Sequence, residues 1–295
     1  MRQWQGSVVR LCLYWNPNAG GATSLDEVSA LLVAAGHHLE CVVERPTDLP
    51  EVFDVAIDCV VAAGGDGTVA RAGRALAGGA IPLAILPLGT ANNIASSLGI
   101  SGSLEEAIAA WRHQRIVRID VGVIQHDGET RFLESVGAGL VVAGINGGTA
   151  VIPRNGDPVS NVARARELYV ETIEQLQPQH CDITLDGASI GGDYLLVEVL
   201  NIPSVGPGVS LSADVNPADG LLSVVVATEA EREQLAAYLK AIQNGEPASA
   251  GLRSWRASHV ELRALAEFHV DDDVRSAHGA AVTIGITPAS LAVIA

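Results

Sequence analysis

Short apolar runs alternate with segments of helical spacing through the first 120 residues of the chain. The runs have the length and the small or β-branched composition of buried strands, and they span residues 8–14, 39–44, 59–63 and 81–87. Turn residues follow each run. A β-α-β-α order of this kind predicts a parallel sheet with helices on both of its faces.

The pattern changes near residue 121, where β-type runs separated by turns replace the alternation. These runs cover residues 121–125, 130–136, 181–185, 194–201, 221–228 and 259–265. Asp127-Gly128 has the composition of a hairpin turn. Two helical segments interrupt the runs, residues 162–176, for which Asn161 is the expected cap, and residues 232–243. We therefore expect a domain boundary near residue 121 and a mostly antiparallel second domain.

Two glycine-bearing turns follow neighbouring strands of the predicted parallel sheet. The first is Gly64-Gly65-Asp66-Gly67-Thr68, and the second is Leu88-Gly89-Thr90-Ala91-Asn92. A strand, a glycine turn and a helix together direct backbone N–H groups at a phosphate, and open α/β sheets bind ligands at this edge. An aspartate in such a turn repels phosphate unless it holds a cation or orients a neighbouring group. The turns indicate a nucleotide site with a metal, with ordinary tight turns as the alternative.

The order Gly-Gly-Asp-Gly-Thr and then Pro-x-Gly-Thr-x-Asn resembles the diacylglycerol kinase catalytic family, which includes bacterial lipid kinases and sphingosine and ceramide kinases. The resemblance implies an α/β nucleotide-binding domain over residues 1–121 and a β-sandwich over residues 122–280 that lines the acceptor cleft. Residues 281–295 would return to the first domain. ATP and Mg²⁺ are the implied cofactors. The implied nucleotide contacts are Asn16, Pro17, Gly20, Thr47, Gly64, Gly65, Asp66, Gly67, Thr68, Gly89, Thr90 and Asn92.

The resemblance continues through the second half of the chain. Residues 211–222 look like the loop that holds a structural magnesium in bacterial members, which implies Asp219, Asn216 and Leu221 as its ligands. Oxygen atoms of a tight loop suit a hard cation, and an ordinary Asx turn is the alternative. The resemblance also implies Asp271 as the catalytic base.

The acidic run at residues 271–273 also bears on the base assignment. On a strand, Asp271 and Asp273 share a face and Asp272 points away. We therefore expect Asp273 to orient the base and Asp272 to be solvated, with an acidic surface turn as the alternative. Asp66 is the third expected catalytic residue.

Four departures from the family pattern leave the substrate open. Arg71 stands where the family has an acid, Asn93 replaces a frequent aspartate, the first loop has Asn18-Ala19, and Asp-Gly-Glu has become three aspartates. Arg71 could bind a phosphate bidentately or be a solvated helix residue.

The implied activity is that of an ATP-dependent lipid kinase of phospholipid biosynthesis, with diacylglycerol as the leading acceptor. One alternative is a NAD kinase-type phosphotransferase, which shares the first glycine turn but lacks the Pro87–Asn92 pattern. The other is a nucleotide-binding regulatory protein without turnover.

The net charge and the composition of the chain exclude some classes of binding partner and indicate where the protein is located. A net charge of −16 argues against nonspecific nucleic-acid binding and against strong electrostatic docking on an anionic membrane. Cys12 and Cys59 lie in predicted strands and are expected to be buried free thiols. The chain shows no signal-peptide layout and no apolar run of the ~18 residues that span a bilayer. We expect a cytoplasmic protein; transient contact with the inner face of the membrane and a homodimer both remain open.

Overall fold

The computed structural model describes residues 9–19, 23–47, 49, 56–111, 115–151 and 157–295. The chain divides into two compact units. Unit 1 comprises Met1–Ile119 and Ala289–Ala295, and unit 2 comprises Asp120–Pro288. Two long strands, β5 (Ile116–Gln125) and β18 (Val282–Ile294), contribute residues to both units.

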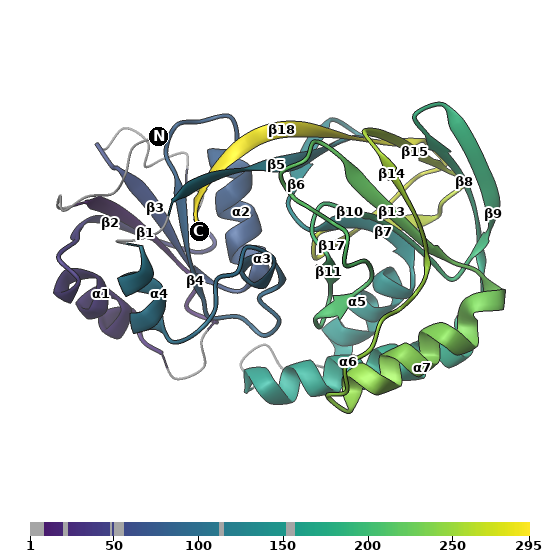
Figure 1. Ribbon diagram of the computed structural model, residues 1–295, viewed down its shortest axis with the longest axis horizontal. Helices are drawn as coiled ribbons and strands as arrows, with labels where there is room; N and C mark the ends of the chain where they lie inside the picture. Colours follow the sequence, from purple (N-terminus) through teal and green to yellow (C-terminus); the bar gives the residue numbers. More distant parts are fainter. Residues whose placement is uncertain (1–8, 20–22, 48, 50–55, 112–114, 152–156) are drawn as a thin grey trace. The chain divides into compact units, whose positions relative to one another are not determined.

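Unit 1 is built on a parallel sheet in the order β2-β1-β3-β4 (Figure 1). Its strands are β1 (Arg10–Trp15), β2 (His38–Glu44), β3 (Cys59–Gly64) and β4 (Leu83–Pro87). Every neighbouring pair is parallel, and Val293 of β18 extends the sheet in parallel beside Leu83. The predicted parallel sheet is confirmed.

Helices cover both faces of this sheet. The helices are α1 (Leu25–Ala34), α2 (Asp66–Leu76), α3 (Asn93–Ser97) and α4 (Leu104–Ala110). Figure 1 shows α1 and α4 on one face and α2 on the other. Side chains alternate along β1, so that Leu11 and Leu13 pack with Leu32 of α1 and Ile108 of α4. Ser103 and Glu106 form a capping box at the start of α4.

Unit 2 contains two antiparallel sheets. The first has the order β14-β13-β10-β7-β16-β17, and the second joins β18, β15, β8 and β9, with β5 and β6 as a hairpin. The strands are β6 (Glu129–Phe132), β7 (Ser135–Gly139), β8 (Gln179–Leu185), β9 (Ala188–Tyr194), β10 (Leu196–Leu200), β13 (Leu222–Ala227), β14 (Arg253–Ala257), β15 (His259–Arg263), β16 (Glu267–Val270) and β17 (Asp273–Ser276). A short ladder, β11 (Ser204–Val205) with β12 (Val209–Ser210), lies apart from both sheets.

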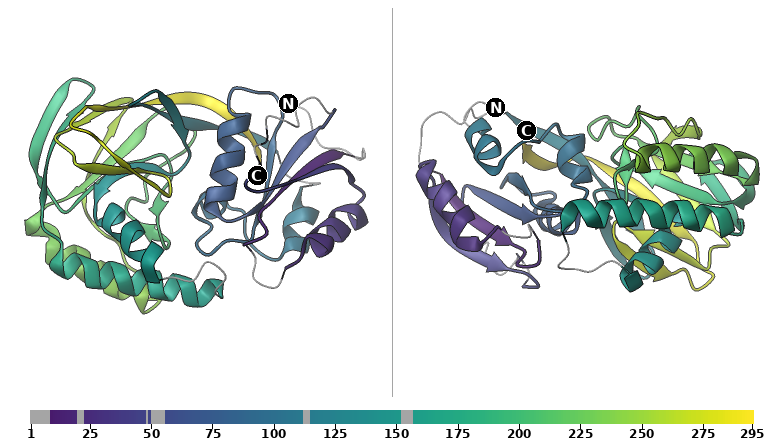
Figure 2. Two further views of the ribbon diagram at one scale, coloured as in Figure 1. Left: turned by 180° about the vertical axis from the view of Figure 1, so that it is seen from behind. Right: turned by 90° about the horizontal axis from the view of Figure 1, so that it is seen from below.

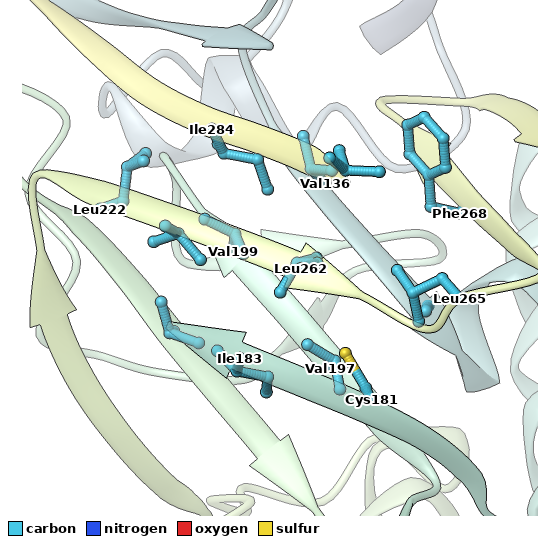
Figure 3. Close-up of a cluster of buried hydrophobic side chains, with 14 of the residues drawn as sticks. Val136, Cys181, Ile183, Val197, Val199, Leu222, Leu262, Leu265, Phe268 and Ile284 are labelled. Atoms are coloured by element: carbon cyan, nitrogen blue, oxygen red, sulfur yellow. The ribbon is translucent and has the colours of Figure 1, made fainter. Parts of the chain in front are cut away.

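The two sheets of unit 2 face each other over an aliphatic core. Val197 and Val199 point from the first sheet toward Ile183, Leu262 and Ile284 of the second (Figure 3). All five side chains are almost completely buried. The predicted mostly antiparallel β-sandwich is confirmed.

Three helices cover the other face of the first sheet, α5 (Leu140–Val151), α6 (Pro158–Gln175) and α7 (Arg232–Gln243), with the short η2 (Glu229–Glu231) before α7. Figure 2 shows α6 and α7, in teal and green, side by side. Tyr169 and Ile173 of α6 and Leu235 and Leu239 of α7 bury their side chains against Leu196.

The structure corrects some expected elements and confirms others. Helix α5 was not expected, because its glycines weaken the helical signal. Asn161 is not the cap of α6: the helix starts at Pro158, and the Asp157 carboxylate accepts the Ser160 N–H. The run 130–136 is two strands, β6 and β7. The Asp127-Gly128 turn is confirmed.

Cys12 and Cys59 are buried free cysteines, as expected. Among the described residues, no helix combines the length and the apolar character that a membrane span requires.

Candidate functional site

The two glycine turns of unit 1 touch each other at the carboxyl edge of β3 and β4. The Leu88 N–H donates to the Gly64 carbonyl at 3.0 Å. A Cβ atom on Gly89 would lie 2.2 Å from the Gly65 Cα, so no larger residue fits at that position without moving the turns apart. The close approach brings two stretches of backbone together at the edge where the sequence predicts a phosphate site.

Asn92 shapes the second turn. Its Oδ1 accepts the Gly89 N–H at 2.9 Å, and its Nδ2 donates to the Gly89 carbonyl at 3.0 Å. Asn92 lies in the left-handed region, with φ 52°, where asparagine is favoured over most other residues. Thr90, inside this turn, is exposed. The geometry gives Asn92 a positioning role in the turn.

Asp66 is the first residue of α2, and its carboxylate is directed at the next helix. Oδ1 accepts the Ile94 N–H at the start of α3, at 2.9 Å. Burial raises the pKa of Asp66, and the N–H groups of Ile94, Asn93 and Asn92 oppose that rise. Asp66 therefore ties the first glycine turn to the helix that follows the second.

The N-terminus of α2 has no side-chain cap. Gly65 occupies the N-cap position and supplies no side-chain acceptor, although N–H groups of a first helical turn need partners outside the helix. This arrangement favours an anion. Gly67 lies in this first turn. Thr68 is buried and fills the space beside Gly64, where an added Cβ would lie within 2.4 Å of its Oγ1.

Two arginines gather beside this helix start. The Arg45 Nη1 donates to the Thr68 Oγ1 at 3.2 Å, and the Arg71 Nη2 donates to the Pro46 carbonyl at 3.4 Å. Both side chains are partly buried, so Arg71 is not a fully solvated helix residue. Sequence reasoning missed Arg45, and its position two residues before Thr47 was the available signal. Thr47 itself is exposed, and its N–H donates to Glu44.

The loop after β1 lies beside the end of β3. The Asn16 N–H donates to the Ala63 carbonyl at 3.2 Å, and the Asn16 Oδ1 accepts the Asn18 N–H at 3.1 Å. Pro17 is exposed. Gly20, the last expected residue of this loop, lies outside the described residues.

Asp271 of unit 2 lies in the turn between β16 and β17, with φ 52°. Its Oδ1 accepts the N–H groups of Leu133 at 3.1 Å and Glu134 at 2.9 Å, and only 6% of the residue is exposed. Two backbone N–H groups therefore fix this carboxylate.

The expectation that residues 271–273 continue a strand is wrong, because Val270 pairs with Asp273 across the turn. Asp271 and Asp273 consequently do not share a strand face. The Asp273 side chain is 74% exposed and lies 3.7 Å from the Arg275 guanidinium, while Asp271 is buried. Asp272 is exposed.

A buried ion pair lies next to Asp271. His269 Nε2 is 2.9 Å from Glu198 Oε1, His269 Nδ1 is 2.8 Å from the Asp271 carbonyl, and both side chains are almost completely buried. Burial alone would lower the pKa of His269, but Glu198 and the Asp271 carbonyl raise it. Gly137 leaves room for the pair, since a Cβ there would lie 2.2 Å from Glu198 Oε1. Sequence reasoning missed this pair, although Glu198 interrupts an apolar run.

The loop expected to hold a structural magnesium also lies in unit 2. Arg256 donates to both carboxylate oxygens of Asp219 and to the Leu221 carbonyl. Asn216 accepts the Ala218 N–H through Oδ1 at 3.1 Å, as in an Asx turn. Unit 1 thus brings the two glycine turns, Asp66, Asn92 and the Asn16 loop to one end of β3 and β4, and unit 2 holds Asp271 and Asp219 in separate places.

Comparison with known families agrees with this arrangement. The diacylglycerol kinase catalytic domain matches residues 10–124, and the YegS C-terminal NAD kinase beta sandwich-like domain matches residues 139–295, more than half of the chain. The chain belongs to the diacylglycerol kinase catalytic family, as its two glycine turns predict.

Curated relatives are similar to this chain in sequence, and a solved structure is similar in fold. A "Probable lipid kinase YegS-like" of Klebsiella pneumoniae (strain 342) is 26% identical over 82% of this chain and 80% of its own length. The "Probable lipid kinase YegS" of Escherichia coli (strain SMS-3-5 / SECEC) is 28% identical over 82% and 79%. A diacylglycerol kinase from Bacillus anthracis str. Sterne has the same fold, with a TM-score of 0.75, 22% identity and coverage of 98% of each chain.

Proposed function

We propose that this protein is a lipid kinase that transfers the γ-phosphoryl group of ATP to a lipid hydroxyl, with diacylglycerol as the leading acceptor. One observation carries the proposal: the glycine turns at Gly65 and Gly89 meet at the sheet edge, next to the uncapped N-terminus of α2. Family membership and the lipid kinase names of the curated relatives support it.

Each group of residues has a distinct role in this proposal. The first-turn N–H groups of α2, with Arg45 and Arg71, would bind the phosphates of the nucleotide. Asp66 would hold Mg²⁺, which supplies charge neutralisation on the phosphates when it is bound. The chemistry of Asp66 fits this cation, because a carboxylate oxygen is the type of ligand that Mg²⁺ takes and the side chain lies at the start of α2, where we propose that the phosphates bind.

Unit 2 would supply the general base. The Asp271 carboxylate is held in place by the backbone N–H groups of Leu133 and Glu134, and a carboxylate is a group that can accept the proton of a hydroxyl. Phosphoryl transfer requires mainly positioning and charge stabilisation, and a base that orients the attacking hydroxyl. The proposal therefore requires no covalent enzyme intermediate.

The test is incubation of the protein with ATP labelled in the γ-phosphate, Mg²⁺ and a total lipid extract, followed by identification of the species that gains label. We expect label in a lipid with a free hydroxyl, foremost in phosphatidic acid formed from diacylglycerol. A parallel reaction contains NAD in place of lipid. Label in NADP and not in lipid would replace the proposal with a NAD kinase-type activity.

Nucleotide binding is measured separately, as the shift of the thermal unfolding midpoint with ATP and Mg²⁺. A ligand at ~100 times its Kd stabilises a protein by roughly 2.7 kcal/mol, which such a shift detects. ATP binding without consumption by any lipid or NAD would overturn the proposal and favour a regulatory nucleotide-binding protein.

A further inference from the structure

The guanidinium of Arg256, a residue of β14, occupies the position at which a metal is expected in the loop before β13. Arg256 Nη2 lies 2.6 Å from each carboxylate oxygen of Asp219 and 3.3 Å from the Leu221 carbonyl oxygen. Its Nη1 lies 2.9 Å from the Asp214 carbonyl oxygen. The guanidinium therefore contacts a carboxylate and two carbonyl oxygens, the type of ligand that a hard cation takes.

The oxygens of this loop do not fit a metal as they are arranged. Asp219 Oδ1 also accepts the Leu221 N–H at 3.1 Å, and Asn216 Oδ1 is occupied by the Ala218 N–H. Mg²⁺ requires six oxygen ligands at about 2.0–2.1 Å. A guanidinium cannot lose its proton at ordinary pH, so a divalent cation among these oxygens would face a fixed like charge.

We propose that Arg256 takes the place of a structural metal in this chain, and that the loop folds without a divalent cation. The planar guanidinium suits a carboxylate because it offers several donors in a fixed arrangement. The fold supplies the arginine at the right position: Arg256 pairs with Ser223 across β13 and β14, directly beside the end of the loop. The inference goes beyond the proposed function, since it concerns the folding of unit 2.

The loop that Arg256 closes is connected to the proposed base by consecutive hydrogen bonds. The Gly220 N–H donates to Asp120 Oδ2 at 2.7 Å. Asn201 Nδ2 donates both to the Asp120 carbonyl at 3.1 Å and to the Leu133 carbonyl at 3.0 Å. The Leu133 N–H in turn donates to Asp271. A cation at the loop is therefore part of the framework that positions Asp271.

The first experiment uses the full-length protein without nucleotide. The protein is dialysed against EDTA, and its melting temperature is measured before and after addition of Mg²⁺ or Ca²⁺. We expect no change in either step. A metal-dependent rise that is lost in Asp219→Asn but kept in Asp66→Asn would overturn the inference. A rise lost only in Asp66→Asn would assign the metal to unit 1 and leave the inference intact.

The second experiment removes the arginine. Arg256→Ala should lower the melting temperature by a few degrees, because it removes the partner of the Asp219 carboxylate and two carbonyl contacts, although each side chain of the pair is 31% exposed and water screens the charges. Mg²⁺ or Ca²⁺ should restore part of the loss, since the Asp219 carboxylate and the Asp214 and Leu221 carbonyl oxygens would no longer be occupied by the guanidinium. Arg256→Gln, which keeps donors but no charge, replaces the alanine variant if the latter does not fold.

Arg253→Ala is the matched control, because Arg253 lies on the same strand and its exposed side chain lies 3.3 Å from Glu231. It should change the melting temperature little and give no metal response. An Arg256 variant as stable as the wild type, with no metal response, would refute the proposal. The readout is stability, so either result leaves the lipid kinase proposal to its own assay.

Discussion

Asp66 in unit 1 and Asp271 in unit 2 are both carboxylates held by backbone N–H groups, but their supports differ in origin. Asp66 accepts from Ile94, only 28 residues further along the chain. Asp271 accepts from Leu133 and Glu134, which are separated from it by 138 and 137 residues. One carboxylate is therefore positioned by a local strand-turn-helix repeat, and the other by the pairing of distant strands.

The groups that surround the two carboxylates also differ. The surroundings of Asp66 are mostly backbone, supplied by glycine turns and the first turn of a helix. The turn at Asp271 contacts a buried side-chain pair, Glu198 of β10 and His269 of β16, the strand that leads into the turn. We infer that unit 1 tolerates side-chain changes around its site unless they touch a glycine, whereas unit 2 depends on individual buried side chains.

The largest expected effect comes from breaking the buried pair. His269→Ala leaves the Glu198 charge buried without its partner, and removal of one member of such a pair costs about 3–5 kcal/mol of unfolding free energy. Urea unfolding measures the loss. The exposed His259 of β15 provides the control, and His259→Ala should leave the unfolding free energy unchanged within about 0.5 kcal/mol. Equal losses would show that the pair does not stabilise unit 2.

The same pair predicts a pH dependence. The pKa of His269 is raised above its ordinary 6.5, so the folded state binds the proton more tightly than the unfolded state. Its contribution is complete below about pH 6.5 and is lost as pH rises through the folded pKa. Tyr169 lies near Glu198 and Glu134, and burial followed by these charges raises its pKa, so the tyrosine stays neutral in this range. Urea unfolding at a series of pH values should show this decline in the wild type and not in His269→Ala.

Asp66→Asn tests the backbone-built site. Asparagine can still accept the Ile94 N–H but cannot hold Mg²⁺ as a carboxylate does, so phosphoryl transfer should fall by on the order of 10²–10³-fold. The raised pKa of Asp66 means that its charged form is disfavoured in the folded protein, and stability rises as pH falls through the folded pKa. At pH 7 the variant should therefore melt at the same temperature as the wild type or higher. Full activity would remove Asp66 from the site.

Asp271→Asn tests the base assignment in unit 2. Loss of a general base lowers kcat by ~10²-fold or more, and ATP affinity should not change, because the nucleotide residues lie in unit 1. Asp272 is exposed beside it in the same turn and provides a matched control. Asp272→Asn should retain wild-type kcat. If the two variants lose the same activity, the base lies elsewhere.

The local support of Asp66 and the long-range support of Asp271 also explain which residues of each site could be predicted from the sequence. Gly65, Asp66 and Gly89 follow predicted strands, so a pattern of local turns was sufficient to group them and to predict the parallel sheet. The role of Arg45 depended on how its loop approaches Thr68, and its position two residues before Thr47 was the only sequence signal for it.

In unit 2 the strand pattern predicted the antiparallel sheets, but three neighbouring aspartates gave no sign that Val270 and Asp273 pair across a turn. The partners of Asp219 and His269 come from β14 and β10, far along the chain. Such partners follow from strand order, which periodicity does not determine.

Gly89→Ala tests whether the site of unit 1 depends on the close contact between its two glycine turns, because the substitution disturbs only a backbone contact. The new Cβ would lie 2.2 Å from the Gly65 Cα, so the turns must separate. We expect a loss of about 1–3 kcal/mol in unfolding free energy and a weaker thermal shift with ATP and Mg²⁺. Gly285 has open space around it and no positive φ, which makes Gly285→Ala the control. If Gly89→Ala showed the same thermal shift with ATP and Mg²⁺ as the wild type, the contact between the two turns would not be required for nucleotide binding.

The smallest effect is expected at the bidentate ion pair of unit 1, the counterpart of Arg256 and Asp219. Arg10 and Asp58 are joined by bonds of 2.9 and 3.0 Å, but each side chain is 43% exposed and water screens the pair. Asp58→Asn should lower the melting temperature by less than about 2 °C, and high salt should reduce the difference. Bonds from Arg10 hold the pKa of Asp58 below its ordinary 3.8. The pair therefore stabilises the fold above that pH, and the contribution is lost as pH falls through the lowered pKa. A loss as large as that of Arg256→Ala would mean that charge pairing alone, and not the added carbonyl contacts, makes the unit 2 pair stabilising.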